Sequence, residues 1–251
     1  PLNNKYTYAY DSLNRLVSET DPLNGVTSYA YDANGNRTVV TDANGNTTTY
    51  AYDSLNRLTS QTNPLNGVTS YTYDKNGNKL TVTDALYRVT SYAYNALNRV
   101  TSITAPSSAS ANGAVTGYTY DADGNILTVT DPAGNITAYT YNLNGKALSV
   151  TDPLNNRTSY TYDGNGNLLT VTDALGKVTT YTYDALNRVT SVKDPLLNVT
   201  SYEYDKNGNR TAVVDAETGR SAYTYDALNR LTASTNQIGN TKSYQYDADG
   251  N

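Results

Sequence analysis

The chain has 251 residues, of which 37% are hydrophobic, and it contains no Cys, His, Phe, Trp or Met. Without Cys and His it offers no disulfide framework, no thiolate nucleophile, no thiol-ligated zinc site and none of the commonest general base. The net charge of −5 argues against nucleic-acid binding, and no apolar run approaches the roughly 20 residues of a membrane-spanning helix.

A 21-residue period runs along the whole chain. A Tyr directly before Asp or Asn recurs at residues 10, 31, 52, 73, 94, 120, 141, 162, 183, 204, 225 and 246, and ten of the eleven steps are 21 residues. The step from Tyr94 to Tyr120 is five residues longer, and we assign this insertion to a loop of small residues at 105–117. The period predicts a single continuous array of about twelve repeats over residues 1–251, which grows by stacking.

A longer period of 42 residues lies on top of the first. Phrases such as DSLNRL (11–16 and 53–58) alternate with DANGNR (32–37) and DKNGNK (74–79), and only NLNGKA (142–147) departs from the alternation. The chain also begins and ends within a phrase, so we expect it to be an excerpt of a longer array.

Taken in chain order, each repeat begins with a predicted strand such as 26–32 (VTSYAYD). Its two tyrosines are two residues apart and therefore lie on one face with Thr27, while the intervening residues lie on the other. A second predicted strand follows, such as 78–84 (NKLTVTD), with Leu80 and Val82 on one face, and no helical period competes. Because each tyrosine ring can bury roughly 150–250 Å², we predict that the tyrosine rows form the core.

Turn signals separate the strands. An Asp side chain can accept a hydrogen bond from the backbone two residues further on, and the Asn or Gly that follows tolerates the positive φ of the bend. At four turns the first residue is Asn, which keeps the acceptor and removes the charge: Asn63, Asn95, Asn142 and Asn236. We therefore interpret this position as geometric, and we predict no catalytic, cofactor-binding or metal-binding residue and no enzymatic activity.

The arginines of the LNR phrases are predicted either to lie over tyrosine rings or to pair with turn aspartates. These arginines are Arg15, Arg57, Arg99, Arg188 and Arg230. At an exposed position either contact stabilises the fold by only about 0.5–1 kcal/mol.

Three sharper interpretations compete with a purely structural one. The turns at 32–36, 74–78 and 121–125 place side-chain oxygens on alternate residues, as calcium loops do, but they lack the bidentate Glu, so we favour tight hairpin turns over weak Ca²⁺ binding. Tyrosine rows can stack sugars, although we favour a core. Asn-x-Ser/Thr sequons, whose glycosylation would imply a surface location, occur at Asn36, Asn46, Asn135, Asn156, Asn198 and Asn209.

The iterated phrases, such as YDSLNRLVS (10–18) and YDALNRLTA (225–233), resemble the YD repeats of the Rhs family over the whole chain. That family includes bacterial Rhs polymorphic toxins, insecticidal toxin-complex shells, wall-associated proteins and the animal teneurins. The resemblance implies an all-β fold in which hairpins add side by side into an extended, spiralling antiparallel sheet, often a hollow shell around a toxin. Spacing alone would also allow a single-coil β-solenoid.

Together these features predict a non-enzymatic structural protein of a bacterial surface or secreted Rhs/YD protein, extracellular or at the cell surface, forming an extended fibre or stalk. Self-association, or continuation of the same array at its open edge strands, is the expected partnership. We also consider the encapsulating shell segment of a polymorphic toxin, and a repeat that binds carbohydrate or cell wall through exposed tyrosines. No nucleic-acid partner and no membrane span are expected.

Overall fold

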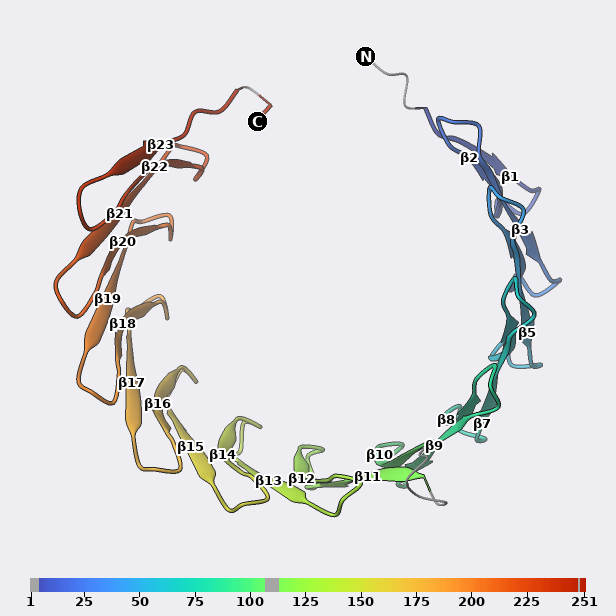
Figure 1. Ribbon diagram of the computed structural model, residues 1–251, viewed down its shortest axis with the longest axis horizontal. Coiled ribbons are helices and arrows are strands. Elements are labelled where there is room, and N and C mark those ends of the chain that lie inside the picture. Colours follow the sequence, from blue (N-terminus) through green and yellow to red (C-terminus); the bar gives the residue numbers. More distant parts are fainter. Residues whose placement is uncertain (1–4, 107–112, 248) are drawn as a thin grey trace. The chain divides into compact units, whose positions relative to one another are not determined.

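The computed structural model describes residues 5–106, 113–247 and 249–251, and within these ranges the chain forms 23 β-strands and no helix. The strands follow one another in chain order (Figure 1). Residue contacts divide the chain into two compact units, residues 1–120 with 129–135 and residues 121–128 with 136–251. The described part offers no helix that could cross a membrane. The all-β prediction is confirmed.

The strands are short, and their bounds repeat with the period of the sequence. The first unit contains β1 (Thr7–Tyr10), β2 (Leu16–Thr20), β3 (Val26–Tyr31), β4 (Arg37–Thr41), β5 (Thr47–Tyr52), β6 (Leu58–Thr62), β7 (Val68–Tyr73), β8 (Lys79–Thr83), β9 (Val89–Tyr94), β10 (Val100–Ala105) and β11 (Ala114–Tyr120). β12 (Ile126–Thr130) lies where the units divide. The second unit contains β13 (Ile136–Tyr141), β14 (Ala147–Thr151), β15 (Arg157–Tyr162), β16 (Leu168–Thr172), β17 (Val178–Tyr183), β18 (Val189–Lys193), β19 (Val199–Tyr204), β20 (Arg210–Val214), β21 (Arg220–Tyr225), β22 (Leu231–Thr235) and β23 (Thr241–Ser243).

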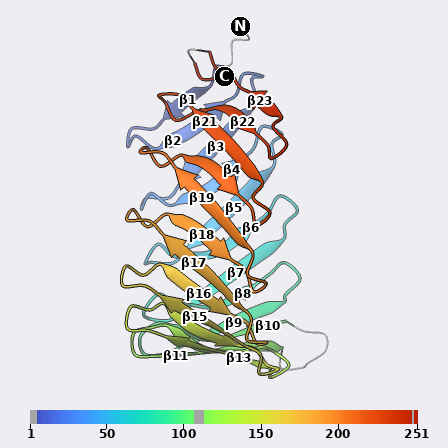
Figure 2. The ribbon, with the colours of Figure 1, turned by 90° about the vertical axis from the view of Figure 1, so that its left-hand side faces the viewer.

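From β1 to β11, and again from β13 to β23, each strand pairs antiparallel with its neighbour in sequence. In each unit the strands lie in one layer (Figures 1 and 2). Tyr29 lies opposite Val40, which lies opposite Thr48, so the tyrosines share one face as predicted. This pairing identifies consecutive hairpins, and the β-solenoid alternative is wrong for these strands.

A β-bulge lies beside the turn that follows the tyrosine pair in ten hairpins. In the β3–β4 pair, Ala30 lies opposite Val39 but Tyr31 lies opposite Arg37, which leaves Thr38 as the additional residue. The same shift occurs in the other hairpins of this kind, for example in β7–β8 and β17–β18. A bulge bends its strand and increases the local twist, so these hairpins carry the same local distortion at the same place.

The tyrosine rows are not a buried core, which corrects the prediction. Among the described residues only Ala212 and Ser149 are buried. The tyrosines of the strands from β3 to β22 are half-buried, and those around β1, such as Tyr8, are exposed. The reason is the single layer, because a ring on a sheet without a second layer is covered only by its neighbours on the same face.

The loop predicted at 105–117 is in part strand. Ala105 ends β10, and residues 114–117 belong to β11, where Gly117 pairs with Ser102. Residues 107–112, which contain most of the predicted insertion, lie outside the described residues. The hairpin continues towards this insertion because Val115 and Thr116 are good strand residues.

The fourth residue of the five-residue turns has a positive φ. Asn or Gly occupies this position in most described turns, such as Asn155 with φ of 63°. The exceptions are Tyr87 (61°), Leu197 (72°) and Thr218 (67°). The left-handed conformation costs an ordinary L-residue roughly 1–2 kcal/mol, whereas Asn and Gly adopt it readily. These three turns are therefore strained.

Replacing Leu197 with Asn should stabilise the second unit. The change converts DPLLN (194–198) into DPLNN, the sequence that the chain itself uses at 152–156. Relief of the backbone strain should raise the free energy of unfolding by about 1 kcal/mol, measured by urea denaturation and by hydrogen exchange of the turn amides. The matched reverse change, Asn155→Leu, should lower it by a similar amount. Equal stability of all three proteins would show that the strain is negligible.

Candidate functional site

The recurring polar network at the hairpin turns is the candidate functional site of this chain. We call the turns that follow the tyrosine pair YD turns, and they begin at residues 11, 32, 53, 74, 95, 121, 142, 163, 184, 205, 226 and 247. The turns at the opposite ends of the strands, such as 21–25 and 42–46, are called return turns. Both kinds close in the same way. In the turn at 32–36 the Asp32 N–H donates to the Asn36 carbonyl (2.9 Å), and the Gly35 N–H donates to the Asp32 carbonyl (3.1 Å).

The side chain of the residue that opens a turn accepts hydrogen bonds from backbone N–H groups within that turn and so holds it closed. Asp32 Oδ1 accepts the backbone N–H groups of Asn34 (2.9 Å) and Asn36 (2.8 Å), and its Oδ2 accepts the side-chain amide of Asn36 (2.8 Å). The hydrogen bond from the Asn36 side chain is the main reason that the pKa of Asp32 lies below its usual value. The predicted bond two residues on is confirmed, and a second one four residues on accompanies it.

Turns that begin with Asn use the same acceptor. Asn63 Oδ1 accepts the N–H groups of Leu65 (2.9 Å) and Gly67 (2.8 Å), and Asn95 Oδ1 accepts those of Leu97 and Arg99 (both 3.0 Å). The oxygen, and not the charge, is therefore what the position needs. The other two predicted positions, Asn142 and Asn236, behave alike.

The sequon asparagines are the fifth residues of such turns. Each donates its side-chain amide to Oδ2 of the Asp that opens the turn, at 2.8 Å for Asn36 and 2.9 Å for Asn209. The others with this bond are Asn46, Asn135, Asn156 and Asn198. The turn geometry accounts for these asparagines, and the strand that follows supplies the Thr of each sequon.

Four arginines of the LNR turns make both predicted contacts at once: Arg15, Arg57, Arg188 and Arg230. Arg15 Nε lies 2.8 Å from Asp11 Oδ2, and the Arg15 guanidinium carbon lies 4.7 Å from the centroid of the Tyr31 ring. Arg15 Nη1 also donates to the Asp32 carbonyl of the next YD turn (3.1 Å). Since Tyr31 and Asp32 belong to the next repeat, this arginine links two repeats.

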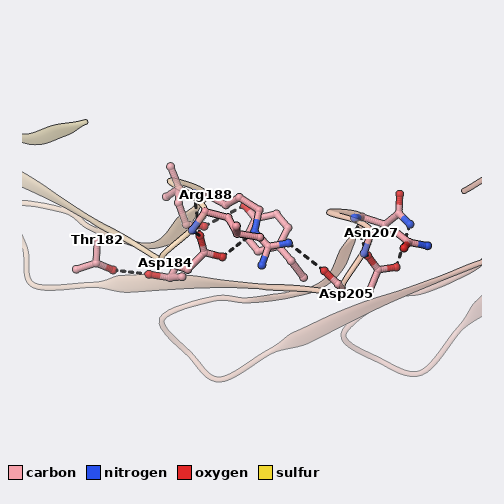
Figure 3. A network of polar contacts seen from close by, with 10 residues as sticks. Thr182, Asp184, Arg188, Asp205 and Asn207 are labelled. Carbon is pink, nitrogen blue, oxygen red and sulfur yellow. Dashed lines mark hydrogen bonds and ion pairs between the residues drawn. The ribbon is translucent and has the colours of Figure 1, made fainter. Parts of the chain in front are cut away.

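The same linkage recurs in the second unit (Figure 3). Arg188 lies between Asp184, which its Nε contacts at 2.6 Å, and Asp205, whose carbonyl accepts Nη1 at 2.9 Å. Its guanidinium carbon lies 4.6 Å from the centroid of the Tyr204 ring. Arg57 and Arg230 pair with an Asp and cover a tyrosine in the same way, and Arg99 covers Tyr120.

In ten of the tyrosine pairs the second tyrosine donates its hydroxyl group to a backbone carbonyl of the preceding repeat. Tyr31 bonds the Leu16 carbonyl (2.7 Å), and Tyr73 bonds the Leu58 carbonyl (2.8 Å). Eight further tyrosines make the corresponding bond: Tyr52, Tyr94, Tyr120, Tyr162, Tyr183, Tyr204, Tyr225 and Tyr246. Partial burial raises the pKa of Tyr73. These bonds were not predicted from the sequence, because Phe replaces neither the first nor the second tyrosine of any pair and so does not single out the hydroxyl groups that bond.

The first tyrosine of each pair has a different environment. YD turns that end in Asn-Gly-Asn, such as 32–36, are called NGN turns. Arg37, which follows such a turn, places its guanidinium carbon 5.6 Å from the centroid of the Tyr29 ring and 5.8 Å from that of Tyr50. Lys79 lies 4.9 Å from the Tyr71 ring. The cation of an LNR turn thus lies over the second tyrosine of the next pair. The cation that follows an NGN turn lies over first tyrosines, Arg37 over those of the preceding and the next pair and Lys79 over that of the preceding pair.

Neighbouring YD turns also interact through asparagines. Asn36 Nδ2 donates to Asn56 Oδ1 of the next turn (2.8 Å), and Asn78 Nδ2 donates to Asn98 Oδ1 (2.7 Å). The corresponding bonds in the second unit join Asn167 to Asn187 and Asn209 to Asn229. An LNR turn therefore reaches the next turn with Arg, and an NGN turn reaches the next turn with Asn. The 42-residue period is the period of this alternation.

The described residues contain no group of three or more acidic, Cys or His side chains arranged to hold a metal ion. In the Asp-x-Asn-Gly-Asn turns considered for Ca²⁺, both carboxylate oxygens of Asp74 already accept hydrogen bonds from the turn. What the arrangement does is mechanical, since it fixes each hairpin and joins it to the next.

A family model described as RHS Repeat matches the chain at residues 10–47, 31–66, 52–89, 73–110, 107–136, 141–176, 162–196, 204–236 and 225–251. The chain belongs to the RHS repeat family. No curated protein matches it.

Solved structures of similar fold come from toxin complexes. The crystal structure of TcdB2-TccC3 is 20% identical with a TM-score of 0.70, and the match covers 93% of this chain and 14% of that one. The TcdB2-TccC3-Cdc42 structure is 19% identical (TM-score 0.54), covering 92% of this chain and 15% of that one. The Photorhabdus luminescens Tc holotoxin pore is 18% identical (TM-score 0.54), covering 99% and 17%. This chain thus spans a small part of each, and the likeness shows the fold of RHS repeats.

Replacing Tyr73 with Phe should destabilise the first unit, whereas Tyr71→Phe should not. Tyr73→Phe removes the bond to the Leu58 carbonyl and should cost about 0.5–1.5 kcal/mol, measured by urea denaturation. Tyr71 lies two residues away on the same face, and its ring contacts Lys79, so it is the matched control. Equal losses in the two variants would show that the ring, and not the hydroxyl group, joins the repeats.

Acid should weaken the turns. The pKa of Asp42 is lowered chiefly by the hydrogen bond from the Asn46 side chain, and the pKa of Asp74 is lowered likewise by Asn78. A carboxyl group with a depressed folded pKa stabilises the fold above its unfolded pKa of about 3.9, and this contribution is lost as the pH falls through the folded value. Stability should therefore be level from neutral pH down to about pH 5 and decline below about pH 4.

The local readout of the acid effect is the hydrogen-exchange protection factor of the Gly45 amide, which bonds the Asp42 carbonyl. This protection should fall with acid in the parent chain. In the Asp42→Asn variant, which retains Oδ1 as an acceptor, it should depend much less on pH. A parallel decline in both proteins would remove Asp42 as the cause.

Deleting 21 residues should harm the first unit more than deleting 42. Removal of 53–73 would place two NGN turns side by side, so that Asn36 would face Gly77 in place of Asn56. Removal of 53–94 would place Asn98 there instead and would restore the bond that Asn36 makes to Asn56 in the parent chain. The shorter deletion should therefore unfold at lower urea concentration. The opposite order would show that the alternation of turns does not stabilise the array.

Proposed function

We propose that this segment is a non-enzymatic structural wall in a secreted or surface-exposed bacterial protein, with one continuous array running through both units. The observation that carries the proposal is the repetition of one linkage, a tyrosine hydroxyl bonded to a carbonyl of the repeat before it, at ten places along the chain. A binding or catalytic site needs a particular constellation once, whereas a wall needs the same joint many times.

The likeness to TcdB2-TccC3 supports the shell of a toxin complex as the assembly to which the segment belongs. A one-layer sheet suits a shell because it encloses the most volume for a given length of chain. The extended fibre or stalk is the second candidate, and the observation that favours it is the uniformity of the turns, which provides for continuation without a defined end. In both cases the immediate partner is a further stretch of the same kind of array.

Cryo-electron microscopy of the native protein that carries this segment tests the proposal. A closed particle with density inside it would support the shell. A continuous filament whose axial repeat matches a whole number of 42-residue pairs would overturn the shell in favour of the fibre. A globular enzyme domain into which the segment folds as a minor part would overturn both.

A further inference from the structure

The described turns contain six Asn-Gly pairs in one geometry, at the third and fourth turn positions. In all six the glycine has a positive φ, and its N–H group donates to the carbonyl of the first turn residue at 2.9–3.2 Å. The asparagines of these pairs are Asn34, Asn44, Asn76, Asn144, Asn165 and Asn207. All six are exposed to solvent.

Asn-Gly pairs are prone to a spontaneous reaction in water. The backbone nitrogen of the glycine attacks Cγ of the asparagine, a C–N bond forms, the Cγ–Nδ2 bond breaks, and ammonia leaves with the proton of the glycine nitrogen. Water then opens the succinimide ring at either carbonyl, which gives aspartate or isoaspartate. The reaction needs no oxidant, but it needs a free glycine N–H group and an asparagine side chain able to turn towards it.

The six pairs differ in how the asparagine side chain is held. Asn76 Nδ2 donates to Asn98 Oδ1 (2.9 Å). In the second unit, Asn165 donates to Asn187 (3.2 Å) and Asn207 donates to Asn229 (3.1 Å). In the described part of the chain, no side-chain hydrogen bond holds Asn34, Asn44 or Asn144.

The hydrogen bond donated by the glycine N–H group does not distinguish the pairs with a held asparagine from the pairs with a free one. The Gly45 N–H lies 2.9 Å from its carbonyl acceptor, and the corresponding distance is 3.2 Å at Gly77 and 3.0 Å at Gly166. Every pair must therefore open its turn before reacting, and the freely rotating asparagines are the ones that open into a reactive geometry with no further bond to break.

We propose that, among these six pairs, Asn34, Asn44 and Asn144 are the sites of spontaneous deamidation in the folded chain, and that Asn98, Asn187 and Asn229 protect Asn76, Asn165 and Asn207. The hydrogen bonds from Asn76, Asn165 and Asn207 to the asparagine of the next YD turn then have a chemical role besides joining the turns. An isoaspartate adds a methylene group to the backbone of a five-residue turn, so protection preserves the register of the hairpin.

The test follows deamidation of the native chain at mildly alkaline pH by peptide mapping and mass spectrometry, beside a sample held in denaturant. In the folded sample the three free asparagines should convert faster than the three held ones by roughly 2- to 10-fold, the effect of one hydrogen bond. In denaturant the six should convert at closely similar rates. Equal rates in the folded sample, or no conversion of any pair, would overturn the proposal.

The Asn98→Gly variant tests the cause. Asn98 has φ of 59°, so glycine retains the turn while removing the acceptor for Asn76. Asn76 should then convert at the rate of Asn34, and Asn165, whose acceptor Asn187 is intact, should keep its slow rate as the internal control. A slow Asn76 in this variant would show that its protection comes from elsewhere.

Discussion

The structure depends on one short-range interaction, the side-chain oxygen that opens each turn and accepts two backbone N–H groups within it. At Asp184 these groups belong to Leu186 and Arg188, at 2.9 and 3.0 Å. A sheet of one layer buries almost no side chain completely, so burial alone does not select one register over another. The hydrogen-bonded turn fixes the register of its two strands instead. Once it has closed, the bulge beside it and the pairing of Tyr183 with Val189 follow.

The fixed register of the hairpins then makes contacts between repeats possible. Because the bulged hairpins share one offset, nine second tyrosines donate to the carbonyl fifteen residues earlier, as Tyr183 donates to Leu168. The one exception in spacing, Tyr120 to Val100, spans the insertion and keeps the bond at 2.6 Å. Each repeat touches only its neighbours, so the stability of such an array is close to a sum of repeat and interface contributions. A lost contact weakens one joint and leaves distant joints intact.

The sequence predicted what is local. The two strands, the positive φ at Asn or Gly and the acceptor role of Asp or Asn all depend on residues within five positions of each other, and the 21-residue period repeats these local signals along the chain. It did not predict the hydroxyl bonds of Tyr31 and its counterparts, because their acceptors are backbone carbonyls, which leave no mark on the sequence. Burial was overestimated for a related reason. An alternating strand pattern reports which face a ring takes, but it does not report whether a second layer covers that face.

The departure from the alternation at 142–147 shows what the 42-residue period preserves. This turn has lost the LNR phrase, yet its Lys146 takes over the linkage, since Nζ donates to the Gly166 carbonyl of the next turn (2.7 Å) and lies 5.3 Å from the Tyr162 ring. The spacing of sixteen residues between cation and ring equals that of Arg15 and Tyr31. Two adjacent LNR turns would bring like charges together, and two adjacent NGN turns would present glycine where asparagine must accept. The unit that can be duplicated without loss is therefore the pair of repeats.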